Sequence, residues 1–517
     1  MMKHTTHAVL LMSLLSGCAD NALLQSDAES TNFEGDTVGD AFREALRLDV
    51  LPISAPSANG EAVLPQSFWL EATEDWGSQR LELAPTVTLS GTITGFAANP
   101  YGATPTVPGS ASQPVEAQIE LYQPDTIAAA VVLTDEDGDF TAQVPAGSGY
   151  RLVVRPLQAG SLPLLVLDNL TLEGDLIDLN ALVEERIEGG LELSYADPVF
   201  GQITDDLGNP IGCTVRIIDA LTGEESTSVS TNAGGYYYLR AEPGEHILEI
   251  IGDERQVIPT VKRQISFEEG TGGGQFDINL GELEPVFISG RVLSAAGTPL
   301  PDAKVRLTAR DLERAAGSLV VEDETNSDGD FLARALPGEW TIEIIPNNES
   351  LSDSSPFEYD QAIGDDDLDL GALQLPPKVL FERQILGVSG EPAGGVVMTF
   401  YQQGFDGSTV SAQTDATGYF LVNLPDVPQT AYLTPTSNPD SAITRRELLS
   451  PSLDGSLKWS LADGAEISGS VRVAGTSGES GNYIIDARSA DGVLLGSLLT
   501  TPNESSARFS LRIDLTE

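Results

Sequence analysis

The sequence predicts an all-β protein, built as a tandem array of β-sandwich units after an N-terminal targeting segment. Three observations lead to this prediction. A turn motif recurs four times at intervals of about ninety residues, a spacing typical of an internal repeat. Segments before each copy alternate apolar and polar residues, as strands with one buried face do. Amphipathic helical periodicity is nearly absent.

Length and composition exclude several classes of protein. The 517 residues are enough for roughly three to five domains. With 41% hydrophobic residues and 51 glycines, the chain is not expected to be disordered as a whole. The 27 basic and 78 acidic residues give a net charge of −51, which argues against a nucleic-acid partner and against adsorption to anionic lipid. Two cysteines and three histidines exclude a disulfide scaffold and a Cys/His zinc cluster.

Residues 1–17 have the features of a signal peptide. Lys3 provides a basic start, and a short apolar run then ends in Leu15-Ser16-Gly17-Cys18. This ending resembles the lipobox of bacterial lipoproteins. The resemblance implies that Cys18 is lipidated, with acyl chains such as palmitate that anchor the protein to a membrane. Ala19 mildly favours the outer membrane. The alternative is an ordinary signal peptide with an incidental cysteine. Polar residues 18–40 are expected to form a flexible tether.

The recurring motif reads Thr, Asp or Asn, two variable residues, Gly, one residue, then an aromatic. An Asp or Asn side chain can start such a turn by bonding to its own backbone, and Gly supplies the positive φ of a tight hairpin. The aromatic residue is expected to point into the core. The structural residues of the motif are Gly138, Phe140, Gly235, Tyr237, Gly329, Phe331, Gly418 and Phe420.

The strands before the motif keep one phase in every copy. Ala303, Val305 and Leu307 alternate in the third copy, and Val396, Met398 and Phe400 alternate in the fourth. Each motif is followed by a turn, usually with Pro or Gly, and a further strand. These phases predict sandwich repeats at 85–196, 197–283, 284–376 and 377–463, flanked by an N-terminal half-unit at 41–84 and a partial fifth repeat at 464–517.

The pattern resembles the carboxypeptidase regulatory-like domain. That domain is a transthyretin-like sandwich related to Cna-B-type and other immunoglobulin-like modules. The resemblance covers about Ser90 to Ala462, and it implies about seven strands per unit and an accessory or spacer role. The two terminal half-units leave a choice open. Either the phase is offset, or the terminal halves complete neighbouring sheets. An uncovered edge strand would also allow a partner to complete it.

Candidate chemistry is sparse. Calcium is the metal that the acidic residues favour, because Asp135, Asp137 and Asp139 cluster in one turn, and Asp365, Asp366 and Asp367 cluster in another. No other cofactor is predicted. His246 lacks a nearby nucleophile in the sequence. Cys213 alternates with Val215 and Ile217, so a buried and inert thiol is expected. Lys304 lies out of phase with the core, which argues against an isopeptide crosslink.

These observations predict a non-catalytic, membrane-anchored lipoprotein of the bacterial cell envelope that acts as a spacer, adhesion or scaffold protein. One alternative is an array of modules that binds an extracellular polysaccharide or protein. A second alternative is an uncharacterised hydrolase accessory protein with a carboxylate site, which would need two acids paired in a cleft.

Overall fold

The computed structural model describes the chain in fifteen ranges, and the ranges follow in order: 45–54, 63–71, 78–95, 112–157, 162–187, 190–193, 196–253, 255–268, 273–347, 353–402, 409–436, 441–474, 481–489, 492–502 and 507–513. The predicted signal peptide, the tether and Cys18 lie outside these ranges. Within the described ranges, no helix has both the length and the apolar character needed to cross a bilayer.

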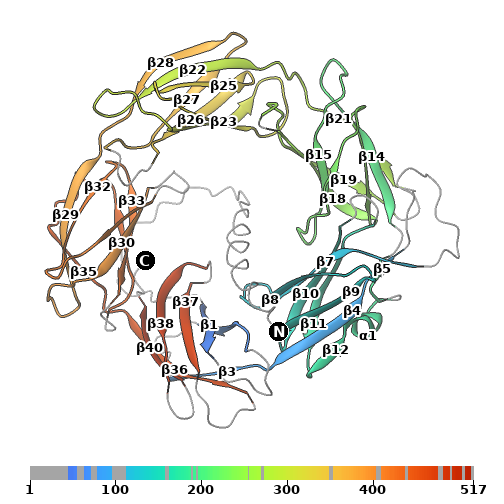
Figure 1. The fold of residues 1–517 in the computed structure, drawn as a ribbon, viewed down its shortest axis with the longest axis horizontal. Helices are drawn as coiled ribbons and strands as arrows, with labels where there is room; N and C mark the ends of the chain where they lie inside the picture. The colour runs from blue at the N-terminus through green and yellow to red at the C-terminus, as the bar shows by residue number, and fades with distance from the viewer. Residues whose placement is uncertain are drawn as a thin grey trace, which may run out of the picture. The chain divides into compact units, whose positions relative to one another are not determined.

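The predicted fold class is confirmed. The described chain is a series of small antiparallel and mixed sheets that form immunoglobulin-like β-sandwiches (Figure 1). We call these sandwiches modules 1 to 5, and we label the strand positions in each module a to g in the order of module 3. One sheet has the order c-b-e-f and the other the order d-a-g, with strands a and g parallel.

Module 3 shows the plan most simply. Its strands a to g are β22 (Val286–Leu293), β23 (Lys304–Leu312), β24 (Val320–Glu324), β25 (Asp330–Ala335), β26 (Gly338–Ile345), β27 (Phe357–Ile363) and β28 (Leu368–Gln374). The sequence phase identifies Val305 and Leu307 on β23 and Ala303 just before it as inward residues. All three are fully buried together with Trp340. The alternation therefore marks the buried face correctly here.

Modules 2 and 4 follow the same plan. The strands of module 2 are β14 (Asp197–Thr204), β15 (Thr214–Asp219), β16 (Val229–Ser230), β17 (Tyr236–Ala241), β18 (Gly244–Ile251), β19 (Val261–Phe267), β20 (Gly274–Gln275) and β21 (Ile278–Asn279). The strands of module 4 are β29 (Val379–Leu386), β30 (Val396–Gln402), β31 (Thr409–Gln413), β32 (Tyr419–Leu424), β33 (Gln429–Pro435), β34 (Thr444–Leu448) and β35 (Lys458–Ser460).

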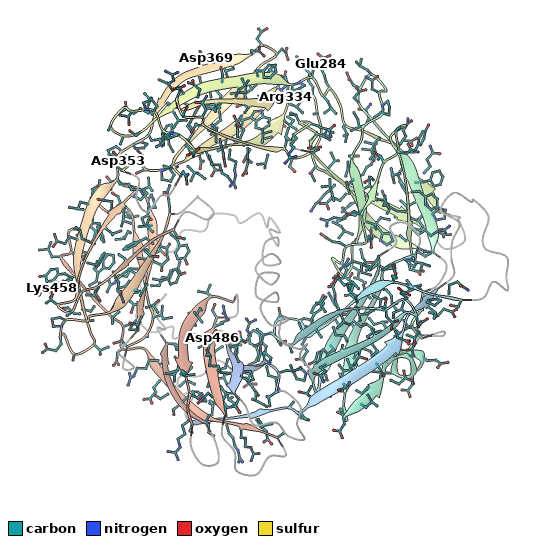
Figure 2. The ribbon with its side chains drawn as sticks, viewed as in Figure 1. Glu284, Arg334, Asp353, Asp369, Lys458 and Asp486 are labelled. Carbon is teal, nitrogen blue, oxygen red and sulfur yellow. The ribbon has the colours of Figure 1, made fainter. Side chains whose placement is uncertain are left out.

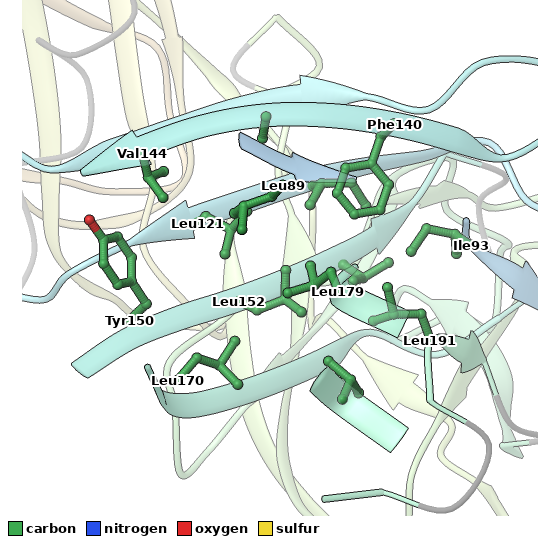
Figure 3. Close-up of a cluster of buried hydrophobic side chains, with 14 of the residues drawn as sticks. Leu89, Ile93, Leu121, Phe140, Val144, Tyr150, Leu152, Leu170, Leu179 and Leu191 are labelled. Carbon is green, nitrogen blue, oxygen red and sulfur yellow. The ribbon is translucent and has the colours of Figure 1, made fainter. Parts of the chain in front are cut away.

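Module 1 adds a short helix to the plan. Its elements are β4 (Thr86–Thr92), β5 (Thr94–Gly95), β6 (Gln113–Pro114), β7 (Ala117–Tyr122), β8 (Ala129–Leu133), β9 (Asp139–Pro145), β10 (Gly147–Pro156), β11 (Leu165–Leu172), β12 (Leu176–Asp178), α1 (Leu179–Glu184) and β13 (Glu192–Leu193). Asp178 caps α1 by accepting a hydrogen bond from the Asn180 N–H at 3.0 Å. The helix buries Leu179 and Val183 against the core shown in Figure 3. Six residues are too few for a helical period to be visible in the sequence.

Module 5 is assembled from both ends of the described chain. Strands a to d are β36 (Ala465–Val473), β37 (Asn482–Arg488), β38 (Leu494–Leu499) and β40 (Ala507–Ile513), with the short β39 (Thr501–Pro502) beside β40. Strands e to g are β1 (Leu46–Ser54), β2 (Gln66–Leu70) and β3 (Ser78–Leu83). The two terminal half-units therefore complete each other, rather than neighbouring sheets.

Each module has its own hydrophobic core. The five clusters of buried apolar residues each belong almost entirely to one module, and the module 5 cluster draws on both half-units. In module 1, Leu89, Leu121, Phe140 and Leu152 meet between the sheets (Figure 3). Burial of such side chains stabilises a fold by roughly 1.5–3 kcal/mol each, so every module carries its own stabilising core.

Candidate functional site

The recurring motif forms the same hydrogen-bonded turn in modules 1 to 4. In module 3, the side-chain oxygen of Asn326 accepts the backbone N–H groups of Asp328 at 2.9 Å and Asp330 at 3.0 Å. Asp135, Asn232 and Asp415 make the equivalent pair of bonds in the other modules. The carboxylates and amides at the head of the motif are thus already occupied in shaping their own turns.

The glycine of the motif holds the turn against strand a. Gly138, Gly235, Gly329 and Gly418 have φ between +73° and +79°. At Gly329 a Cβ would lie 2.5 Å from the Val292 carbonyl oxygen, and the Gly329 carbonyl accepts the Val292 N–H at 2.8 Å. A side chain would therefore meet both left-handed backbone and a clash with a carbonyl.

The aromatic residue two positions later enters the core. Phe140, Tyr237, Phe331 and Phe420 are between 3% and 5% exposed. In modules 1, 2 and 3 the residue facing this ring across strands a and d is a glycine, namely Gly91, Gly201 or Gly290. Module 4 instead places Arg383 opposite Phe420, with its guanidinium 3.9 Å from the centroid of Phe381. The sequence pattern alone does not reveal that these glycines make room for the ring.

The threonine that opens the motif has a role that the pattern does not reveal. Thr325 is 2% exposed, its hydroxyl accepts the Ala303 N–H at 2.9 Å, and it donates to the Leu300 carbonyl at 2.6 Å. Thr134, Thr231 and Thr414 make the matching bonds. In module 5, Thr500 accepts the Tyr483 N–H at 3.0 Å. The hydroxyl therefore fixes the start of strand b to the motif.

The acidic residues that we considered for calcium serve separate local contacts. Asp139 accepts the Thr92 hydroxyl at 2.5 Å, while Asp135 closes its own turn. Asp365 forms an ion pair with Arg314 at 2.7 Å, and Asp367 accepts the Phe287 N–H at 2.9 Å. Across the described part of the chain, no three Asp, Glu, His or Cys side chains converge in a way that could hold a metal ion. Calcium binding stays a sequence-based prediction.

The other residues that the sequence analysis considered, His246, Lys304 and Cys213, lie among groups of their own modules. His246 is 6% exposed, its Nε2 lies 2.7 Å from the Glu242 carbonyl oxygen, and its ring is 5.7 Å from that of Phe267. Lys304 faces outward and pairs with Glu322 at 3.0 Å. Cys213 is half-buried beside a hollow of about 730 Å³ that Arg255 and Gln256 also line. Burial raises the pKa of the Cys213 thiol to about 11, which keeps it protonated near neutral pH.

Buried charges within the described ranges connect strands. Glu249, only 4% exposed, lies between Arg216 and Lys262 on the neighbouring strands β15 and β19, with the Lys262 ammonium at 3.2 Å. Arg383 reaches Asp454 at 3.1 Å. Burial alone would raise the pKa of Asp454, but hydrogen bonds from Ser456 and the Arg383 charge outweigh it and lower the pKa. Each of these charges is therefore paired within its own module.

Asp49 is the buried charge that joins the two halves of module 5. It is 1% exposed on β1, and its carboxylate lies 3.0 Å from Nε of Arg47 and 3.2 Å from Nε of Arg488. The Ser67 hydroxyl donates to it at 2.6 Å. Asp486, labelled in Figure 2, is the residue directly opposite Asp49 on β37. The two arginines offset the repulsion that facing carboxylates would otherwise cause.

Some outward-facing side chains on the d-a-g sheets are apolar. Module 2 exposes Phe200 (38%) and Tyr236 (54%), and module 4 exposes Leu380 (65%) and Tyr419 (44%). Phe200 stands directly opposite Tyr238 in the pairing of β14 with β17. Tyr238 packs 5.5 Å from the Arg240 guanidinium. Three aromatic side chains thus share one outer face of module 2, an arrangement that the scattered sequence positions do not reveal.

Comparisons with known proteins give only a fold-level likeness. No family model matches the sequence, and no curated protein matches it. Among solved structures, a Streptococcal ancillary pilin is 12% identical over 57% of this chain and 99% of its own, with a TM-score of 0.24. The major pilin subunit BcpA of Bacillus cereus is 11% identical over 54% of this chain and 99% of its own, with a TM-score of 0.16. The open form of the pilus adhesin SpaC from Lactobacillus rhamnosus GG is 11% identical over 90% and 53%, with a TM-score of 0.15. Values this low add nothing on function.

Proposed function

We propose that this protein is a non-catalytic lipoprotein of the bacterial cell envelope, in which a row of carboxypeptidase regulatory-like sandwiches serves as a scaffold or adhesion surface. The observation that carries the proposal is the use of its buried polar groups. Asp49 and Glu249 form ion pairs between strands, Arg383 pairs with Asp454, and the motif threonines bond to backbone. These buried polar groups therefore stabilise the sandwich fold. The net charge of −51 supports solubility of the protein.

The proposed membrane location rests on the lipobox-like Leu15-Ser16-Gly17-Cys18. The proposed anchor is a set of acyl chains on Cys18, since each buried methylene contributes about 0.8 kcal/mol to membrane binding. The test is expression of the full chain in a bacterium, with metabolic labelling by an alkyne fatty acid and separation of membrane and soluble fractions. The wild-type chain should carry label and stay with the membrane. Cys18→Ser should lose the label.

The second cysteine provides the matched control. Cys213→Ser removes a thiol of module 2 and should leave labelling and fractionation unchanged. A Cys18→Ser chain that still takes up fatty acid would contradict the anchor. An outer-membrane fraction separated on a density gradient would decide between the two membranes of a Gram-negative host.

A second candidate function is glycan binding by module 2. Phe200, Tyr236 and Tyr238 provide flat apolar faces on one side of a sheet, and sugars stack on such faces. The strongly acidic chain would favour neutral over anionic polysaccharides. A glycan array should then show a neutral ligand whose binding falls with Tyr236→Ala, while Leu207→Ala, an exposed residue of the same module, should leave it unchanged. Equal binding by both variants would exclude this face.

A further inference from the structure

Module 5 is the one sandwich of the described chain whose two parts are not consecutive in sequence. Residues 46–83, which we call the donor segment, supply strands e, f and g. Residues 465–513, the acceptor segment, supply strands a to d. The donor strand β1 pairs with β37 from Arg47 to Ser54, and β3 runs parallel to β36 over six residues, from Ser78 to Leu83.

Neither segment forms a closed sandwich alone. Strand β1 lies between β37 and β2 in the c-b-e-f sheet, so without it the hydrogen-bonding edge of β37 is open. The donor segment places Leu46, Leu48, Val50, Leu81 and Leu83 in the shared core, each at most 3% exposed. Separated segments would expose these side chains and two strand edges, which is the condition that favours strand addition.

Charged pairs set the register between the two segments. Asp49 of the donor meets Arg488 of the acceptor at 3.2 Å, and Glu82 pairs with Arg472 on β36. A shift of one residue would move the apolar residues of β1 to the outer face and bury Asp49 without these partners. The acceptor therefore recognises this donor sequence specifically.

In the other modules, chain connectivity strongly favours pairing of strands e to g with strands a to d of the same copy. In module 5 this advantage is much smaller. In module 3, strand d ends at Ala335 and strand e begins at Gly338, so a short turn keeps the partners together. In module 5 the two segments are joined only through modules 1 to 4. Loop-closure entropy makes the intramolecular advantage smaller as the closing loop grows. Every copy carries an identical donor and an identical acceptor.

From these observations we propose that module 5 is a strand-exchange site, whose acceptor segment also takes the donor segment of a second copy of this chain. The contacts made are those of the closed module, so exchange needs no new interface. After one such exchange, one copy keeps an unpaired donor segment and the other an unpaired acceptor segment. A closed dimer forms if these two pair with each other, and a head-to-tail chain forms if each pairs with a further copy.

A disulfide trap tests this proposal. Leu51 and Ile484 are half-buried and face each other across β1 and β37. Two full-length chains in a Cys213→Ser background, one with Leu51→Cys and one with Ile484→Cys, would be co-expressed and exposed to a mild oxidant. A disulfide-linked dimer is expected, with the bond mapped to the two new cysteines by mass spectrometry. Each variant expressed alone should give no such dimer.

The geometry of the trap has its own control. A single chain with both substitutions should close internally and run as a compact monomer on a non-reducing gel. If this chain crosslinks while the co-expressed single variants stay monomeric, strand exchange is overturned. A second measurement does not depend on cysteines. Two differently tagged wild-type copies should co-purify. Complete absence of wild-type co-purification would equally overturn the proposal.

Discussion

Gly290 lies directly opposite Phe331 in the paired strands β22 and β25, and a Cβ on Gly290 would come within 2.7 Å of the phenyl ring. The same pairing recurs for Gly91 with Phe140 and for Gly469 with Phe509. The aromatic ring that ends each turn therefore lies over the strand that opens the module. This contact couples a local turn signal to the packing of the d-a-g sheet.

Gly290→Val is expected to destabilise module 3, because the ring of Phe331 must leave its place in the core. Overpacking of this kind costs about 1–3 kcal/mol. Thermal unfolding followed by circular dichroism would measure the loss. Gly364→Ala is the matched control in the same module, since nothing lies within 4 Å of a Cβ there. Equal melting of the two variants would show that the ring does not need the glycine.

Gly329→Ala tests the turn itself. Its φ of +76° strains a residue with a side chain, and the added Cβ would lie 2.5 Å from the Val292 carbonyl oxygen. Gly297→Ala has nearly the same φ, +79°, but its nearest neighbour would be 3.9 Å away. We expect a loss of about 1–2 kcal/mol for Gly297→Ala from backbone strain, and a larger loss for Gly329→Ala. Chemical denaturation of both variants gives the comparison, and equal losses would rule out the carbonyl clash.

Asp49→Ala should open module 5 more readily than any exposed charge change does. The substitution removes the buried carboxylate that Arg47 and Arg488 share, and the loss of hydrogen bonds to a charged group costs about 1.5–3 kcal/mol. Limited proteolysis should then cut the chain between the donor segment and module 1 sooner. Glu466→Ala removes a half-exposed partner of Arg512 at 3.7 Å and should change stability by at most about 1 kcal/mol. Similar rates of proteolysis for the two variants would contradict a central role of Asp49 in holding the donor and acceptor segments together.

The thiol of Cys213 should react slowly with alkylating agents at neutral pH. Its pKa is raised from 9.0 to about 11 by burial, so the neutral form is favoured in the folded state. The corresponding stability is present below pH 9 and is lost as the pH rises towards 11. The alkylation rate should increase about tenfold per pH unit over the range from 7 to 10, since the thiolate is the reactive form. Fast labelling at pH 7 without denaturant would contradict this prediction, and labelling in urea gives the unburied reference rate.

The sequence determined the elements whose causes are local. The order of Thr, Asp or Asn, Gly and aromatic dictates a turn through bonds within a few residues, as between Asn326 and Asp330. Alternation along Ala303, Val305 and Leu307 marks the buried face because neighbouring side chains of a strand point to opposite sides. Both signals can be recognised without knowing which strand is the neighbour.

Only the tertiary structure decided the relations between residues far apart in the chain. The pairing of Asp49 with Arg488 and the platform of Phe200 with Tyr238 depend on which strands meet. The periodic pattern of a strand shows which of its faces is buried, but it does not identify the strand that pairs with it. For that reason the sequence indicated two half-units at the ends of the chain, and the fold joined them into one sandwich.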